Sequence, residues 1–296
     1  MVETTPRAFA SKRAIDGTEE FYSLSGDELR FFKTMTGITD EVLLKEHIIA
    51  VQRDAYKSHA YPCIATFSFL KLKLSKLPAY DQLIALGKAR NSIYLDLGCC
   101  FGTDVRKAVL DGYPMQNIIT TDIIPDFWNL GHKLFKTTPK TFPIPFLAGD
   151  AFKPDFLEAV EPLYTAPSTP RLNLSELTSL NSLHGHVSVI SVCAIFHLFS
   201  AEEAQFQLAQ NIAGLLSSEP GSMILGYHIG REEAGVRVGQ GTAGTDFRLF
   251  CHSPESWTEL WDGKLFWKGM VRVEARLMDH TTDQTYQMLE WSVTRL

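Results

Sequence analysis

Basic residues are too scarce in this sequence to favour a nucleic-acid partner. The 28 lysines and arginines are outnumbered by 34 aspartates and glutamates, which gives a formal charge of −6. Proteins that bind DNA or RNA usually carry a basic stripe that neutralises phosphates, and the sequence has none. The densest basic run, KLKLSK at 71–76, interleaves lysine with leucine, and we interpret it as the solvated face of an amphipathic helix.

Cysteines and long apolar runs are scarce as well. The five cysteines show no C-x-x-C spacing, which disfavours a disulfide framework or a zinc site and makes a reducing compartment the default. No histidine pair has metal-binding spacing, so no metal is expected. Apolar runs stay well below the ~20 residues that cross a bilayer, and the N-terminus lacks a signal-peptide core. We therefore expect a cytoplasmic protein without a membrane span.

Strand and helix patterns alternate from residue 93 onward. Five apolar runs predict strands, at 93–98, 117–123, 142–150, 187–196 and 222–229. Because helical segments separate these runs, we expect an α/β fold with a doubly wound parallel sheet. Two further segments, 270–279 and 286–296, alternate with period 2 around the polar turn HTTDQT. They predict a terminal antiparallel hairpin that extends one edge of a Rossmann-like, seven-stranded sheet.

The N-terminal residues have a different pattern. Residues 26–59 are typical of two helices, and 81–90 predict another. We therefore predict two domains, an N-terminal helical cap over 1–90 and a cofactor-binding sheet domain over 91–296. The cap is rich in aromatic residues, which form either ordinary core or a cover for an apolar substrate. They are Phe31, Phe32, Tyr56, Tyr61 and Phe67.

Two stretches lack a periodic pattern. Residues 165–185 form an insertion before the strand predicted at 187–196. Residues 231–247 contain glycines at 235, 239, 241 and 244 and are expected to form a loop, either a surface linker or a lid.

The stretch IYLDLGCCFGTDVRKAVLDG, 93–112, has the pattern of a cofactor-binding turn between a strand and a helix. Its two adjacent cysteines also raise the alternative of a redox pair. A dinucleotide turn requires G-x-G-x-x-G, and the positions after Gly98 do not fit it. Asp96, Gly98, Cys100 and Gly102 match D-x-G-x-G-x-G except at the third position. A carboxylate here suits a cationic group, such as the ammonium of S-adenosylmethionine (SAM).

Acidic residues also end the next two predicted strands. Asp122 ends the second, where a carboxylate can accept hydrogen bonds from both ribose hydroxyls. Asp150 ends the third, where it can bind an adenine amino group, and after Ala151 the ring of Phe152 can stack on adenine. The carboxyl ends of parallel strands meet at one edge of a sheet, so these three acids are expected to converge.

With these residues the sequence resembles the class I SAM-dependent methyltransferases over about 90–296. Further segments resemble fungal secondary-metabolite methyltransferases of meroterpenoid pathways, namely YPCIATFSFL, CAIFHLFSAEEAQ, PGSMILGYHIG and HSPESWTELW. The resemblance implies SAM as cofactor, S-adenosylhomocysteine (SAH) as product, a small apolar substrate and a homodimer through the N-terminal helices. It implies cofactor contacts from Asp96, Gly98, Cys99, Gly102, Asp122, Ile123, Asp150, Ala151 and Phe152.

His197 is the candidate catalytic residue, because it follows the fourth strand where the resemblance places the methyl acceptor. It would act as a base or position the acceptor, and the alternative is a structural histidine at the edge of the core. His228 and His252 are weaker candidates. The expected reaction is O-methylation of a carboxylate, which is ionised at pH 7 and needs no base. N-methylation of a peptide-derived metabolite and a non-catalytic SAM-binding partner subunit are the alternatives.

Overall fold

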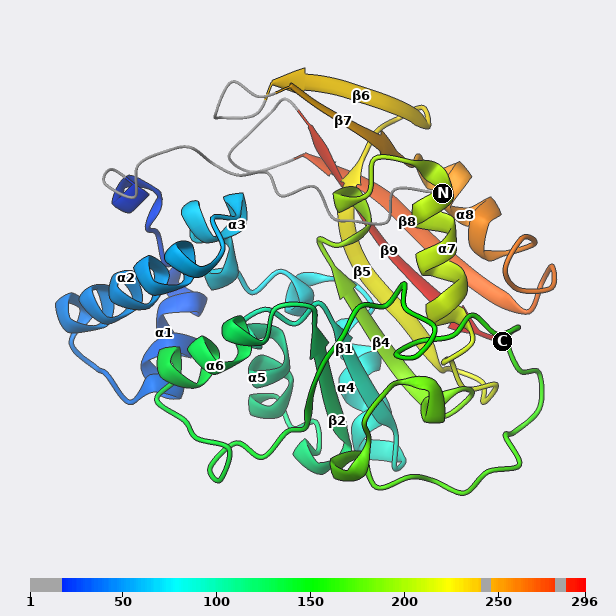
Figure 1. Ribbon diagram of the computed structural model, residues 1–296, viewed down its shortest axis with the longest axis horizontal. Coiled ribbons are helices and arrows are strands. Elements are labelled where there is room, and N and C mark those ends of the chain that lie inside the picture. The colour runs from blue at the N-terminus through cyan, green and yellow to red at the C-terminus, as the bar shows by residue number, and fades with distance from the viewer. Residues whose placement is uncertain (1–17, 241–245, 280–285) are drawn as a thin grey trace.

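The computed structural model describes residues 18–240, 246–279 and 286–296 (Figure 1). The predicted turn HTTDQT and the middle of the predicted glycine-rich loop lie outside the described residues. The helices are α1 Gly26–Thr36, α2 Glu41–Ser58, α3 Pro62–Ala65, α4 Tyr80–Ala89, α5 Thr103–Leu110, α6 Pro125–Leu134, α7 Glu202–Ala213 and α8 Pro254–Trp261. The strands are β1 Ile93–Leu97, β2 Ile118–Asp122, β3 Phe146–Ala148, β4 Val187–Cys193, β5 Met223–Gly230, β6 Gly235–Gln240, β7 Asp246–Cys251, β8 Val271–Asp279 and β9 Gln287–Arg295.

The main sheet has seven strands in the order β3-β2-β1-β4-β5-β9-β8. Neighbouring strands from β3 to β5 are parallel, whereas β9 is antiparallel to both β5 and β8. The predicted doubly wound sheet with a terminal antiparallel hairpin is therefore confirmed. The third strand is shorter than predicted, because Pro143 and Pro145 have no N–H group to donate to a strand ladder.

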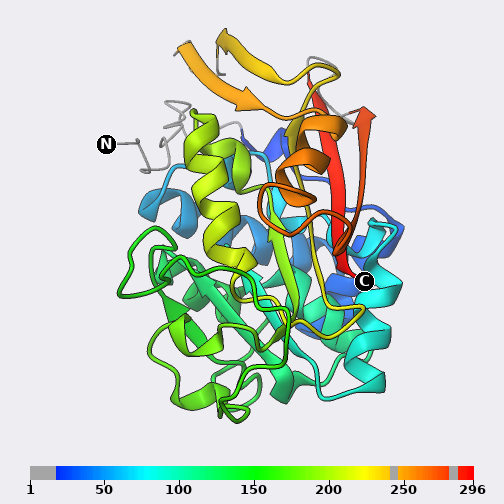
Figure 2. The ribbon, with the colours of Figure 1, turned by 90° about the vertical axis from the view of Figure 1, so that its right-hand side faces the viewer.

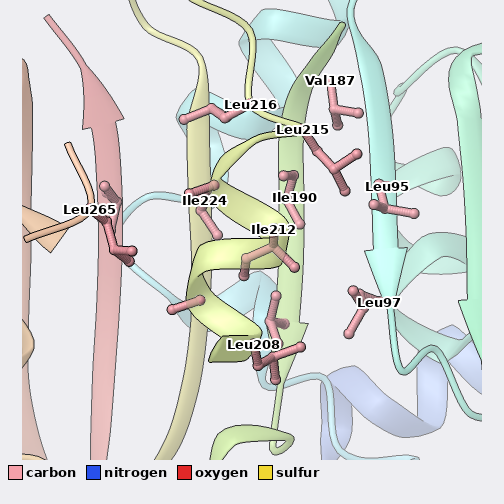
Figure 3. Packing of buried hydrophobic residues seen from close by; sticks show 14 of the residues in the cluster. Leu95, Leu97, Val187, Ile190, Leu208, Ile212, Leu215, Leu216, Ile224 and Leu265 are labelled. Atoms are coloured by element: carbon pink, nitrogen blue, oxygen red, sulfur yellow. The ribbon is translucent and has the colours of Figure 1, made fainter. Parts of the chain in front are cut away.

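Helices cover both faces of the sheet. On one face, Leu208 and Ile212 of α7 pack over Ile190 of β4 and Ile224 of β5, and all four side chains are fully buried (Figure 3). Burying each such side chain contributes about 1.5–3 kcal/mol, so this contact holds α7 against the sheet. Figure 2 shows α7 and α8 lying in front of the strands on this face. The other face is covered by α4 and α5.

The N-terminal helices α1–α3 form a separate aromatic cluster that packs against α6. Phe32 of α1 stacks on Phe135 at the end of α6, with ring centroids 5.4 Å apart. The Asp40 carboxylate caps α2 by accepting hydrogen bonds from the N–H groups of Val42 and Leu43, each 2.9 Å long. Helix α4 packs on the sheet instead. The predicted division at residue 90 stays a prediction.

The stretch that was predicted to be a loop forms a second sheet. Strands β6 and β7 pair antiparallel, with Val236 opposite Phe250 and Val238 opposite Arg248. The loop prediction was therefore wrong for these residues, because Val236 and Val238 alternate with polar neighbours as in a strand. In Figure 1 this hairpin stands away from the main sheet. No helix among the described residues combines the length and the apolar character that a membrane span requires.

Candidate active site

Asp96 is held at the end of β1 by a cross-strand hydrogen bond. Its partner in the register is Ser191 of β4, whose Oγ donates to Asp96 Oδ1 at 2.5 Å. Since Ser191 uses its proton on Asp96, it accepts from the Tyr94 hydroxyl at 2.9 Å. Burial raises the pKa of Asp96 to about 7, although the hydrogen bond from Ser191 opposes the rise. The carboxylate is therefore fixed in place and poorly solvated, which suits the binding of a cation.

The turn after β1 depends on two glycines. Gly98 and Gly102 have φ angles of 77° and 67°, in the left-handed region that glycine tolerates best. A Cβ on Gly98 would lie 2.4 Å from the Ile195 side chain, and one on Gly102 would lie 2.6 Å from Trp128. Cys100 between them also has a positive φ, 50°, which costs a residue with a side chain more than glycine.

Asp122 joins the end of β2 to this turn. Its Oδ2 accepts a hydrogen bond from the Cys100 N–H at 2.8 Å, and its Oδ1 accepts one from the Ile124 N–H at 3.0 Å. A carboxylate can accept about four hydrogen bonds, so two acceptor positions are left for the hydroxyls of a ribose. Burial raises the pKa of Asp122, and these backbone hydrogen bonds oppose the rise.

The residues after β2 and β3 offer an apolar surface beside these acids. Ile123 is 47% exposed although it is a large apolar residue. Asp150 Oδ1 accepts a hydrogen bond from the Phe152 N–H at 2.9 Å, which orders the turn around Ala151. The Phe152 ring meets Phe199 edge to face at 4.8 Å. Cys99 is buried and its N–H donates to the Thr121 carbonyl, so this residue holds the turn by its backbone.

His197 lies in the 3₁₀ turn Phe196–Leu198, directly after β4. Burial, and then the positive charge of Lys73, lower the pKa of His197 to about 4, so the ring is neutral at pH 7. Its Nδ1 atom is buried and has no hydrogen-bond partner. Ala194, in the same connection, has a φ of 58°. Backbone strain of this kind is most often found at functional sites.

His228 and His252 belong to the core instead. His228 is 1% exposed, and its Nδ1 accepts a hydrogen bond from Trp291 Nε1 at 2.9 Å. His252 Nδ1 pairs with Ser256 Oγ at 2.9 Å. Both rings contact Trp257, so they are parts of a buried aromatic cluster.

Lys73, whose charge acts on His197, and two residues linked to it were not predicted from the sequence. Lys73 places its Nζ 5.3 Å from the centre of the ring of Tyr227, which lies in β5 opposite Cys193, the last residue of β4. Asp104 lies in the first turn of α5, and burial raises its pKa to about 8 while the charge of Lys73 opposes the rise. The interpretation of 71–76 as a solvated helix face was therefore wrong, since Lys73 is largely buried next to the site. In the described ranges, no three His, Cys, Asp or Glu side chains are grouped so that they could hold a metal ion.

The relatives that match this chain in sequence are methyltransferases. The family model of the meroterpenoid methyltransferase N-terminal domain matches residues 18–70. The O-methyltransferase atr3 of Stereocaulon alpinum is 33% identical over 190 residues, which cover 63% of this chain and 47% of atr3. The Asnovolin E/Chermesin D methyltransferase nvfJ of Aspergillus novofumigatus is 30% identical over 216 residues, which cover 73% of this chain and 68% of nvfJ. A SAM-dependent methyltransferase structure from Methanosarcina mazei aligns with 70% of this chain and 94% of its own, at 11% identity and a TM-score of 0.47.

The strand order with its reversed β9 and the glycine turn after β1 are those of the class I SAM-dependent methyltransferase fold. More narrowly, the chain belongs to the family of fungal methyltransferases that includes nvfJ. The predicted family and its cofactor, SAM, are thereby confirmed. The chain spans between about half and two thirds of the length of the curated relatives it matches.

Proposed function

We propose that this chain binds SAM and methylates a carboxylate oxygen of a small apolar secondary metabolite. When bound, SAM supplies a methyl group on a sulfonium sulfur, whose S–C bond breaks as the carboxylate oxygen forms the new C–O bond. The observation that carries the choice of acceptor is His197, a neutral and weakly basic histidine at the end of β4.

The cofactor contacts are proposed for the residues at the ends of β1, β2 and β3. Asp96 would bind the ammonium, Asp122 the ribose hydroxyls and Asp150 the adenine amino group. Ile123 and Phe152 would contact the flat faces of the adenine. The support for these roles is the two acceptor positions left on Asp122 and the exposed, apolar Ile123 beside it.

The weak basicity of His197 argues for an acceptor that is already ionised. A phenol keeps its proton at neutral pH, so it needs a base with a pKa near the working pH. His197, with a pKa lowered to about 4, is too weak a base for that task. A carboxylate needs no base, and His197 would then position the acceptor through its unpartnered Nδ1 atom. The relative atr3 is an O-methyltransferase, which supports methylation at oxygen.

The test uses SAM that carries a radiolabelled methyl group and a panel of apolar carboxylic acids. Each acid is paired with its amide and with a phenol of the same carbon skeleton. We expect label in the acids only, and mild alkali should release it as volatile methanol, because esters are hydrolysed under conditions that spare ethers and N-methyl groups. Label that resists alkali would contradict carboxylate methylation and favour an amide or phenol acceptor, as in N-methylation of a peptide-derived metabolite. Binding of SAH without any transfer would favour a non-catalytic partner subunit.

We also infer a homodimer through the N-terminal helices. Val42 and Leu43 at the start of α2 are 66% and 58% exposed, which is unusual for two adjacent apolar side chains. Light scattering should give twice the mass of the 33.2 kDa chain, and Val42→Asp together with Leu43→Asp should halve it. A monomeric wild-type protein would refute the dimer. The cytoplasmic location stays a prediction.

A further inference from the structure

Lys73 is a half-buried lysine whose ammonium forms no ion pair in the described part of the chain. Within the described residues its ammonium makes no hydrogen bond and no ion pair, and its only described polar contact is the Tyr227 ring at 5.3 Å. An ammonium that leaves water loses hydration, and an aromatic face returns only part of that loss. The nearby Lys71 shows the usual alternative, because its Nζ pairs with the Glu28 carboxylate at 3.1 Å.

The place of Lys73 is set by the chain between α3 and α4. The Phe69 carbonyl accepts a hydrogen bond from Thr103 Oγ1 at 2.9 Å, which ties this segment to the start of α5. Leu72 and Leu74, on either side of Lys73, are buried in the apolar clusters. The backbone is therefore anchored before and after Lys73, and the position of its ammonium over β5 is a result of the fold.

Groups of the proposed methyl-transfer site surround this ammonium. The charge of Lys73 acts on His197 beyond the end of β4 and on Asp104 in α5. The negative charge of Asp96 in β1 in turn helps to raise the pKa of Asp104. The Lys73 ammonium is thus within electrostatic reach of one carboxyl group, that of Asp104, and of the neutral His197, but it is ion-paired with neither.

We propose that Lys73 is the counter-ion of a carboxylate that binds at the carboxyl ends of β4 and β5. The inference rests on the proposed methyltransferase function and adds a residue of the N-terminal segment to that site. Two sources can supply the carboxylate. The methionyl end of the cofactor carries one next to its ammonium, which Asp96 or Asp104 would bind, and the acceptor carries one that His197 would help to position.

The test compares wild type with Lys73→Met, which keeps an apolar stem but removes the charge. Lys76→Met is the matched control, since Lys76 is exposed in the same 3₁₀ turn region. Calorimetry measures SAH and its decarboxylated analogue, and ligand-observed NMR measures benzoate and benzamide with and without SAH. If Lys73 binds the cofactor, Lys73→Met should weaken SAH about tenfold or more and leave the decarboxylated analogue unchanged. If it binds the acceptor, the preference for benzoate over benzamide should disappear.

Two further readouts separate this role from a structural one. Lys73→Met should melt at a higher temperature than wild type without ligand, because an unpaired buried charge is lost, and Lys73→Arg should restore carboxylate binding. Lys73→Gln is a second neutral variant if the Met protein folds poorly. The proposal is overturned if Lys73→Met still prefers SAH to its decarboxylated analogue, and benzoate to benzamide, as strongly as wild type does. Failure of wild type to bind SAH would instead overturn the proposed function, and the benzoate comparison without SAH would still test Lys73.

Discussion

Replacing Asp96 by Asn should stabilise the ligand-free protein by an amount that grows with pH. Asp96 is 3% exposed, and burial raises its pKa to about 7 from 3.8. The folded protein therefore keeps the Asp96 proton up to about pH 7, whereas the unfolded chain releases it near pH 4. Because the folded state binds more protons in this window, stability falls as the pH rises from about 4 to 7.

The size of the effect follows from the two pKa values. Relative to a group that stays neutral, the raised pKa lowers the free energy of unfolding by about 4 kcal/mol at pH 8 and by about 1.5 kcal/mol at pH 5. Asn has nearly the shape of a protonated Asp96, and its Oδ1 can still accept the hydrogen bond from Ser191. We therefore expect Asp96→Asn to gain about 2.5 kcal/mol more at pH 8 than at pH 5.

The measurement is the free energy of unfolding in urea at both pH values. Asp155→Asn serves as the matched control, because Asp155 is exposed and its side chain makes no hydrogen bond or ion pair in the described part of the chain. Asp96→Asn should also bind SAH more weakly than wild type, since the ammonium of SAH loses its charged partner. If Asp96→Asn gains the same free energy of unfolding at pH 5 and pH 8, or loses stability at pH 8, then Asp96 is not a buried carboxylate whose ionisation destabilises the folded state.

Three other predictions concern the turn after β1, its partner Asp122 and the acceptor side. Asp122→Ala should abolish measurable SAH binding by calorimetry, because ribose hydroxyls lose a charged acceptor worth about 1.5–3 kcal/mol and the turn loses its hydrogen bond from Cys100; unchanged affinity would rule out the ribose role. Cys100→Gly should be more stable than Cys100→Ala by about 1 kcal/mol in urea unfolding, because the φ of Cys100 is positive. At Cys99, whose φ is not positive, the Ala variant should be the more stable one. The same order of stability at both positions would contradict this reasoning. His197→Ala should lower kcat about 10- to 100-fold and leave SAH affinity unchanged, while His184→Ala changes neither; wild-type turnover would make His197 structural.

The fold could be predicted from the sequence wherever local signals were complete. Helix α8 has a complete local start signal, because Ser253 Oγ accepts a hydrogen bond from the Ser256 N–H and Pro254 occupies the first helical position. Strands β6 and β7 were missed for the opposite reason. Gly235 and its neighbouring glycines are loop signals, and they outweighed the alternation that ends in Val238.

The candidate site was only partly predictable, for a physical reason. Asp96, Asp122 and Asp150 follow apolar runs, so their place at strand ends can be derived from the neighbouring residues. The positions of Lys73 and Asp104 depend on how the segment before α4 packs against α5, which is a contact between parts of the chain distant in sequence. Nothing local to KLKLSK distinguishes a lysine that faces the site from one that faces water.

Cys100 shows how the same turn can tolerate a side chain where the D-x-G-x-G-x-G pattern has glycine. Its positive φ presents the backbone N–H to Asp122, while its side chain packs against the aromatic cluster of the N-terminal helices. The cost of the left-handed conformation, about 1–2 kcal/mol, is thus offset by an apolar contact outside the proposed cofactor site. Since Lys73 also comes from the chain that follows these helices, the N-terminal segment contacts both the cofactor turn and the acceptor side. Any movement of the α1–α3 cluster would therefore act on both proposed ligands at once, through Cys100 on one side and Lys73 on the other.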